Sequence, residues 1–156
     1  MSFRKELADE KVGSLPLRDA IAVDGHTVVR AAVALMRSHG LGCTVIVDHH
    51  CRPAGIFTEQ SVIRMLVQGV CLDTTPVSQF CDPHFFVLRT DDPIEKAWEA
   101  VTRSGARFLC VTDKSGELIG LTGQRGLSEY LCDTYSQQVT VQRLGSAPWM
   151  LQREGA

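Results

Sequence analysis

The sequence predicts a mixed α+β (α/β) fold in which one structural unit is built twice along the chain. The first observation is a series of landmarks that recurs without a gap after a shift of 65 positions. The second is that each copy has an apolar face at helical spacing, followed by two short runs rich in β-branched residues. Repetition fixes the architecture before any local assignment is made. It also suggests that function lies in the cleft between the two halves. The landmark pairs are Val12/Val77, Ala32/Ala97, Gly40/Gly105, Asp48/Asp113, Gly55/Gly120 and Leu66/Leu131.

Size and composition narrow the class of protein. A chain of 156 residues suits one compact domain or two small units that share a core. The net charge of −2 argues against a nucleic-acid partner, because such proteins usually present a strongly basic face. No apolar run approaches the ~20 residues that cross a bilayer, and residues 1–11 are charged, unlike a secretory signal. We therefore expect a cytoplasmic protein with no membrane partner.

Six cysteines raise the question of disulfides. An even number fits a disulfide framework in a secreted chain, but nothing here indicates export. Cys43 and Cys110 lie inside apolar, strand-like runs, where a free cysteine packs as a small hydrophobe. We expect all six thiols to be reduced, as is usual in the cytosol. The other four are Cys51, Cys71, Cys81 and Cys132.

The first helix of the second copy has a clear start. Asp92 is expected to cap it, with Pro93 at the first helical position and Glu95 completing a capping-box pattern. The first copy repeats this helix with Thr27 at the cap. The apolar faces are formed by Ile94, Ala97, Trp98 and Val101 in one copy and by Val29, Ala32, Val33 and Met36 in the other. The residues expected to end these helices in a left-handed conformation are Gly40 and Gly105.

Two strands and a second helix follow in each copy. Residues 43–47 and 108–111 are short apolar runs that favour buried strands, and each ends at an aspartate followed by a turn. Second strands are expected over residues 54–57 and 118–122, and second helices begin near Thr58 and Gly123. These patterns divide the chain into an N-terminal segment (1–11), two repeats (12–70 and 77–133) and a C-terminal tail (134–156). The tail, with Trp149, Met150 and Leu151, is either a partly ordered terminus or a segment that docks on a partner chain.

The repeated unit resembles a CBS domain, the module named for cystathionine β-synthase. The resemblance is carried by the helix that ends in glycine, the apolar strand that closes on aspartate, and the strand-to-helix junctions Gly-Ile-Phe-Thr (55–58) and Gly-Leu-Thr-Gly (120–123). Two such units in tandem resemble a Bateman module. The resemblance implies two βαββα repeats packed with pseudo-two-fold symmetry, and homodimers. It also implies an adenosyl ligand such as AMP, ADP, ATP, S-adenosylmethionine or NAD between the repeats, and no required cofactor.

The strand-to-helix junctions are suited to phosphate, because the first backbone amides of a helix are unpaired and the helix dipole favours an anion. The resemblance implies a hydroxyl residue after the strand and a ribose-binding aspartate three positions later. Thr58 and Ser61 occupy these positions in the first copy, and Gly123 and Gly126 do so in the second. Neither copy therefore has the aspartate. The loss of its charged hydrogen bonds is expected to weaken ligand binding by about tenfold to a hundredfold. The two glycines are expected to let a ligand approach the backbone closely.

The remaining candidate residues flank these junctions. Arg125 stands beside the second junction, where it either meets a phosphate or points to solvent. By family analogy, the extended segments near residues 21–23 and 86–88 form the other wall and contact adenine. The candidate ligand-binding residues are therefore Ile21, Ala22, Val23, Thr58, Ser61, Phe86, Val87, Leu88, Thr122, Gly123, Arg125 and Gly126.

Several motifs suggest chemistry that we discount. Asp48-His49-His50-Cys51 spells the signature of protein palmitoyltransferases, but it falls in a predicted hairpin turn and lacks their zinc-binding region. Adjacent residues rarely converge on one ion, so a metal site is not expected there. Residues 120–126 lack the Lys-Ser/Thr of a phosphate-binding P-loop. We expect no catalytic residue and no enzyme. Two hypotheses remain: a regulatory adenosyl-binding module with an unknown regulated partner, or a ligand-free dimerisation and protein-interaction module.

Overall fold

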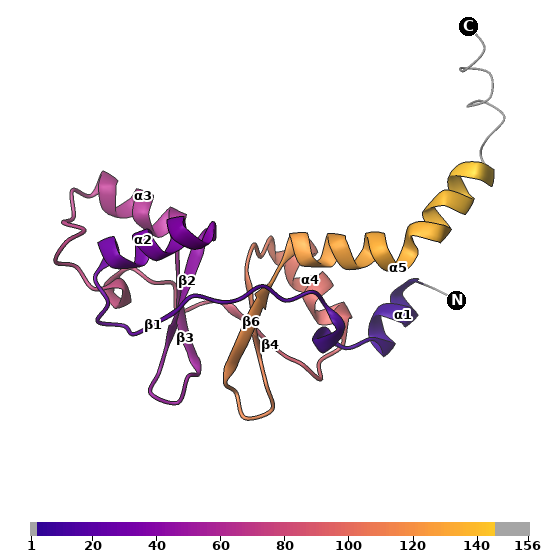
Figure 1. The fold of residues 1–156 in the computed structure, drawn as a ribbon, viewed down its shortest axis with the longest axis horizontal. Coiled ribbons are helices and arrows are strands. Elements are labelled where there is room, and N and C mark those ends of the chain that lie inside the picture. Colours follow the sequence, from indigo (N-terminus) through magenta and orange to yellow (C-terminus); the bar gives the residue numbers. More distant parts are fainter. Residues whose placement is uncertain (1–2, 146–156) are drawn as a thin grey trace, which may run out of the picture.

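The computed structural model describes residues 3–145 and contains two three-stranded sheets, each with its own helices (Figure 1). The two sheets lie at the centre of the molecule, and the helices lie toward its outer sides. This confirms the predicted mixed α+β fold. The first half contains β1 (Ala22–Val23), α2 (Val29–His39), β2 (Cys43–Val47), β3 (Pro53–Thr58) and α3 (Glu59–Val67). The second contains β4 (Phe86–Arg89), α4 (Ile94–Ser104), β5 (Leu109–Thr112), β6 (Leu118–Thr122) and α5 (Gln124–Gly145), and α1 (Phe3–Asp9) precedes both.

The two sheets share one topology. In the first, β1 runs parallel to β2 and β2 runs antiparallel to β3. In the second, β4 runs parallel to β5 and β5 runs antiparallel to β6. Even the irregularity is repeated, because the register shifts between Ile46 and Val47 in one sheet and between Val111 and Thr112 in the other. The 65-residue repeat therefore corresponds to a repeated strand order.

The turn after each central strand is held by its aspartate, as the sequence predicts. Asp48 Oδ1 accepts hydrogen bonds from the amides of His50 and Arg52, at 2.8 and 2.9 Å. Asp113 Oδ1 accepts them from Ser115 and Glu117, at 2.8 and 3.0 Å. The hydrogen bond from the amide of Arg52 is the main cause that lowers the pKa of Asp48. The two aspartates thus do the same structural work, which is to close a hairpin.

Each repeat begins with a segment before its first strand, residues 12–21 and 77–85, that packs against the other repeat, and we call these two segments the leaders. The amide of Val12 donates to the carbonyl of Asp92 at 2.8 Å, and the amide of Val77 donates to the carbonyl of Thr27 at 2.9 Å. Because these contacts are images of each other under the 65-residue shift, the exchange is reciprocal. It extends to the apolar interior, where Val12 joins the core of the second half and Val77 joins the core of the first.

This exchange explains why the predicted helix caps were wrong. Asp92 and Thr27 lie one residue too early, because Pro93 and Val28 are the N-cap residues and no side chain caps either helix. The amide of Ile94 instead donates to a backbone carbonyl of the N-terminal segment at 3.0 Å. A backbone carbonyl from the segment just before each repeat, that of Glu10 for α4 and that of Thr75 for α2, therefore satisfies the amide that a side-chain cap would otherwise pair.

The helix ends agree with the sequence in two cases and differ in a third. Gly40 and Gly105 end α2 and α4 in the left-handed region, with φ of 59° and 64°. The second helix of the second repeat does not stop at residue 133, because α5 continues to Gly145. Part of the predicted tail is therefore helical, whereas Trp149, Met150 and Leu151 lie outside the described residues.

The N-terminal segment forms a helix that the sequence analysis did not identify. Helix α1 packs on α4, and Leu7 is 1% exposed within the core of the second half. The charged residues around Leu7 masked this single apolar anchor in the sequence. As a result, α1 covers the second half, and within residues 3–145 no helix covers the first half in the same way.

The six cysteines are free in the structure. Burial raises the pKa of both Cys43 and Cys110 to about 12, so these two thiols stay protonated in the folded chain. Within residues 3–145, no helix combines the length and apolarity needed to cross a membrane.

Candidate functional site

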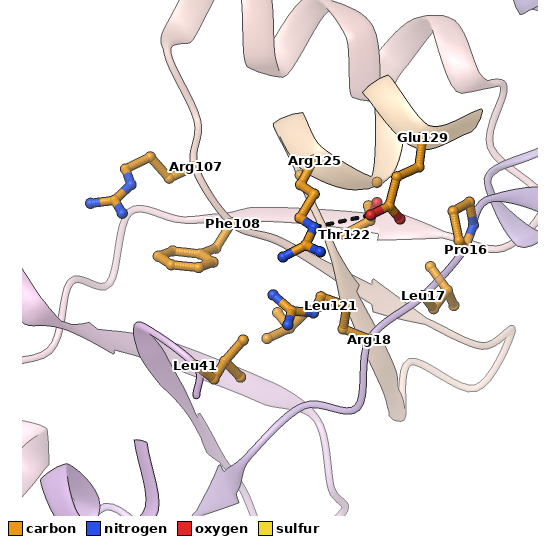
Figure 2. A pocket seen from close by; sticks show the side chains of 12 residues that line it. Pro16, Leu17, Arg18, Leu41, Arg107, Phe108, Leu121, Thr122, Arg125 and Glu129 are labelled. Carbon is orange, nitrogen blue, oxygen red and sulfur yellow. Dashed lines mark hydrogen bonds and ion pairs between the residues drawn. The ribbon is translucent and has the colours of Figure 1, made fainter. Parts of the chain in front are cut away.

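A cavity of about 200 Å³ lies where the two repeats meet (Figure 2). Its walls come from the leader of the first repeat and from the start of α5 in the second, so neither repeat forms it alone. An adjoining cavity of about 350 Å³ shares Leu17, Arg18 and Leu41 with it and adds Asp19 and His39. We call the first cavity the second cleft. It is lined by Pro16, Leu17, Arg18, Leu41, Arg107, Phe108, Leu121, Thr122, Gly123, Arg125, Gly126 and Glu129.

Backbone pairing between the repeats positions one wall of the second cleft. The amide of Arg18 donates to the carbonyl of Leu121, and the amide of Leu121 donates to the carbonyl of Arg18, each at 2.8 Å. Arg18 thereby continues the sheet beyond the edge of β6 for a single residue. Because this bridge fixes the leader, the Arg18 side chain is held across from the start of α5.

The last residue of β6 supplies a polar group that has no partner. Thr122 is 5% exposed, and its Oγ1 makes no hydrogen bond to the protein. A buried hydroxyl without a partner costs about 1–3 kcal/mol. Thr44 Oγ1 is in the same state but does not line this cavity, so the position of Thr122 beside the cleft distinguishes it. Thr122 lines the second cleft just before the first amides of α5, which are also available to an anion.

The two glycines at the second junction are packed closely against other parts of the chain and also line the cleft, so close approach of a ligand there stays a prediction. A Cβ atom built on Gly123 would lie 2.2 Å from the carbonyl oxygen of Arg107. A Cβ atom on Gly126 would lie 2.5 Å from Thr122 Oγ1 and 3.2 Å from the carbonyl oxygen of Pro16. These positions are glycine because neighbouring parts of the chain occupy the space beside them.

The charges around the second cleft are unequal. Arg18, Arg107 and Arg125 face a single carboxylate, that of Glu129. Arg125 Nε is 3.0 Å from Glu129 Oε1, an i,i+4 pair on the exposed side of α5. The guanidinium of Arg107 lies 5.5 Å from the ring centre of Phe108. The lining therefore carries an excess of positive charge and favours an anionic ligand.

The equivalent junction of the first repeat, which we call the first cleft, has its predicted residues Thr58 and Ser61 bonded to each other. Thr58 caps α3 in a capping-box arrangement with Ser61, whose Oγ accepts from the Thr58 amide at 3.4 Å. The guanidinium of Arg64 also donates to Ser61 Oγ, at 3.5 Å, and to the carbonyl of Phe80, at 3.2 Å. Ser61 is 2% exposed. The Ser61 hydroxyl, which the sequence suggested as a ribose contact, thus forms hydrogen bonds within the protein.

Equivalent positions of the two clefts carry different chemistry. The 65-residue shift pairs Arg64 with Glu129, so the charge at this position is reversed between the clefts. It also pairs Phe57 with Thr122, which replaces a fully buried ring by a hydroxyl with no partner. The fold is therefore symmetric, whereas the two candidate sites are not.

The residues predicted for the second wall do not line this cavity. None of the six wall residues lines the second cleft: Ile21, Val23 and Leu88 are buried in the cores, and Ala22, Phe86 and Val87 are exposed. The leader residues Pro16, Leu17 and Arg18 form this wall instead, because the bridge to β6 brings them there. Of the predicted residues, Thr122, Gly123, Arg125 and Gly126 do line the cleft. The sequence reasoning missed Arg18, Arg107 and Glu129, although their charges beside apolar runs were visible.

Comparison with known proteins identifies the family. The family model for the CBS domain matches residues 12–68 and again residues 77–133. The chain belongs to the CBS domain family. It is a tandem CBS pair, as the sequence resemblance implied. An uncharacterized protein of Methanopyrus kandleri is 27% identical over 132 residues, which cover 82% of this chain and 67% of that protein.

Solved structures share the fold of this CBS pair. A CBS domain protein from Pyrobaculum aerophilum, complexed with AMP, has a TM-score of 0.68 at 22% identity and covers 75% of this chain and 89% of that one. The CBS domain pair of protein MJ0100, in complex with 5′-methylthioadenosine and S-adenosyl-L-methionine, has a TM-score of 0.68 at 15% identity. That match covers 80% of this chain and 97% of the other. At these identities the likeness shows the fold.

Proposed function

We propose that this CBS pair is a regulatory module, without catalysis of its own, that binds an adenosine nucleotide or related adenosyl ligand in the second cleft. The observation that carries the proposal is the buried hydroxyl of Thr122, which lacks a partner among the described side chains and belongs to a residue that lines a cavity between the two repeats. Structural relatives complexed with AMP and with S-adenosylmethionine support the ligand class. Because the cleft joins two repeats, a ligand bound there can change how they sit against each other. A cytoplasmic location and an unknown regulated partner stay predictions.

The test is a binding measurement with a set of adenosyl compounds. Isothermal titration with AMP, ADP, ATP, S-adenosylmethionine and NAD is expected to give heat for at least one of them. The same ligand is expected to raise the melting temperature, because a ligand that binds only the folded state stabilises it. Absence of both signals at millimolar concentrations of all five compounds would exclude this function.

The alternative is a ligand-free dimerisation or protein-interaction module, and a different surface favours it. Helix α3 exposes large apolar side chains, and Ile63, Leu66 and Val67 are 59%, 60% and 82% exposed. A cavity of about 620 Å³ between α2 and α3 lies beside them. Exposed apolar patches of this kind usually mark an interaction site. We therefore also propose that the chain forms a homodimer through this face.

Sedimentation of the protein with and without nucleotide separates the two functions. A dimer whose dissociation constant is indifferent to every adenosyl compound supports the interaction role alone. The double variant Ile63→Glu/Val67→Glu is expected to sediment as a monomer, because two carboxylates would be buried without partners. The matched control Ile119→Glu changes an exposed residue of β6 and should leave the dimer intact. A double variant that still dimerises would rule out this face.

A further inference from the structure

We propose that the second cleft selects ligands that carry a phosphate group, which is bound between Arg18 and Arg125. This inference rests on the proposed function and specifies the ligand class. Figure 2 shows the guanidinium groups of the two residues directed toward one another across the cavity. Arg18 belongs to the leader of the first repeat, and Arg125 belongs to the first turn of α5 in the second. An anion placed between them would therefore bind to both repeats at once.

The net positive charge of the cleft lining favours the binding of an anionic ligand. Three arginines and one glutamate line it, so the lining carries 3 − 1 = 2 net positive charges. Glu129 forms an ion pair with Arg125, whereas Arg18 and Arg107 form no ion pair with any residue whose side chain the structure describes. A phosphate monoester, which carries close to two negative charges at neutral pH, balances this excess. Its oxygens also match the paired donors of guanidinium groups.

A second feature of the same cavity indicates a hydrogen-bonding ligand. Thr122 Oγ1 is buried and has no partner among the side chains and backbone that the structure describes, and it lies beside the N-terminal turn of α5. The hydroxyl can donate to a phosphate or ribose oxygen, and the first amides of α5 can donate to a phosphate oxygen. The arginines and the hydroxyl approach one cavity from three segments of the chain. Such convergence of donors is what recognition of an anionic group requires.

The first cleft supplies an internal comparison. Under the 65-residue shift, the positions of Arg18, Arg107 and Arg125 are occupied there by Pro83, Gly42 and Gln60. All three arginines are therefore specific to the second cleft and do not follow from the shared fold. This contrast assigns them a local role, because a role in the general architecture would apply to both copies.

Glu129 acts as an internal competitor in this arrangement. Its carboxylate already accepts from Arg125 at 3.0 Å, and it lines the same cavity. A phosphate that binds there must either share Arg125 with this carboxylate or displace the carboxylate. The negative charge of the carboxylate also repels the phosphate. Removing the charge, while keeping the side-chain shape, should therefore tighten the binding of phosphate ligands and leave uncharged ligands unaffected.

The experiment compares AMP with adenosine, which differ by the phosphate alone. We expect the wild-type protein to bind AMP more tightly, and we expect Arg18→Ala and Arg125→Ala each to weaken AMP binding by about tenfold to a hundredfold. Adenosine binding should change little in both variants. Glu129→Gln should tighten AMP binding. Arg103→Ala removes an exposed arginine that pairs with Glu99 on α4 and serves as the matched control, with no change for either ligand.

The outcomes separate this inference from the function on which it rests. Equal affinities for AMP and adenosine, or equal losses for both ligands in Arg18→Ala, would overturn phosphate selection and leave adenosyl binding standing. Binding of S-adenosylmethionine in preference to AMP would have the same meaning. If the wild-type protein binds neither adenosine nor any of AMP, ADP, ATP, S-adenosylmethionine and NAD, the inference and the proposed function both fail. Circular dichroism and thermal melting of each variant establish that it is folded.

Discussion

Gly123 shows how a single residue can look functional in the sequence and prove structural in the fold. Its position corresponds to Thr58 in the first repeat, where a hydroxyl residue caps the helix. In the second repeat the carbonyl of Arg107 occupies the place where a side chain would begin. The glycine is needed because two backbone segments approach each other there. Its effect on ligand binding is therefore indirect, through the position of the loop that carries Arg107.

We predict that Gly123→Ala destabilises the protein by about 1–3 kcal/mol, the usual range for overpacking. The added Cβ would lie 2.2 Å from a backbone oxygen, which cannot rotate away. Urea unfolding followed by circular dichroism measures the change. The control is Gly25→Ala, where the new atom would meet Ser78 Cβ at 3.4 Å, an ordinary contact. Equal stability of the two variants would show that the segment near Arg107 moves aside without cost.

At the scale of the element, the first-repeat leader and helix α1 attach the N-terminal part of the chain to the second repeat. The first-repeat leader supplies Arg18 to the cleft and bonds to β6. Helix α1, which precedes this leader, is packed on α4 through Leu7. The N-terminal part of the chain is thus fixed at two places on the second repeat. It forms one wall of the candidate site and also covers part of the helical surface.

We expect Leu7→Ala to lower the free energy of unfolding by about 2–5 kcal/mol, as buried leucine truncations usually do. Leu7 is 1% exposed, whereas the side chain of Arg103 on α4 is 67% exposed and provides the control. Arg103→Ala should change stability by less than about 0.5 kcal/mol. Urea titration of both variants makes the comparison. A neutral Leu7→Ala would mean that α1 does not contribute to the core.

At the scale of the whole molecule, pseudo-symmetry of the fold does not produce two equal sites. In the first cleft, Arg64 joins Ser61 to the carbonyl of Phe80, and Phe57 fills the position of Thr122. In the second cleft the corresponding hydroxyl lacks a partner. The molecule thus has two halves of similar fold whose junctions differ in the contacts of their side chains.

We therefore predict that titration with the ligand gives a single binding site per chain. Thr122→Val should lower the affinity by roughly tenfold, because it removes a hydrogen bond to the ligand. Thr58→Val is the matched substitution at the first junction and should leave the affinity unchanged, although it weakens the cap of α3. Two equivalent sites, or a larger effect of Thr58→Val, would contradict this asymmetry.

Local patterns were sufficient to predict much of the fold. The strands at residues 43–47 and 118–122 occur where expected, because short apolar runs between turn residues leave few alternatives. Gly40 and Gly105 end their helices for a reason that lies within a few residues of chain. The caps were missed because the groups that pair the first helical amides come from a distant segment. A local pattern does not carry that information.

The same contrast between local patterns and contacts from distant segments applies to the candidate site. Arg125 and the junction at residues 122–126 were predicted, because they adjoin a recognisable strand-to-helix turn. Arg18 was not, because its distance along the chain from β6 gives no sign that the two pair. By itself, the sequence determined a duplicated unit, its order of elements and its family. Only the tertiary structure decided that the leaders are exchanged and that one cleft differs from the other, since both depend on contacts between residues far apart in the chain.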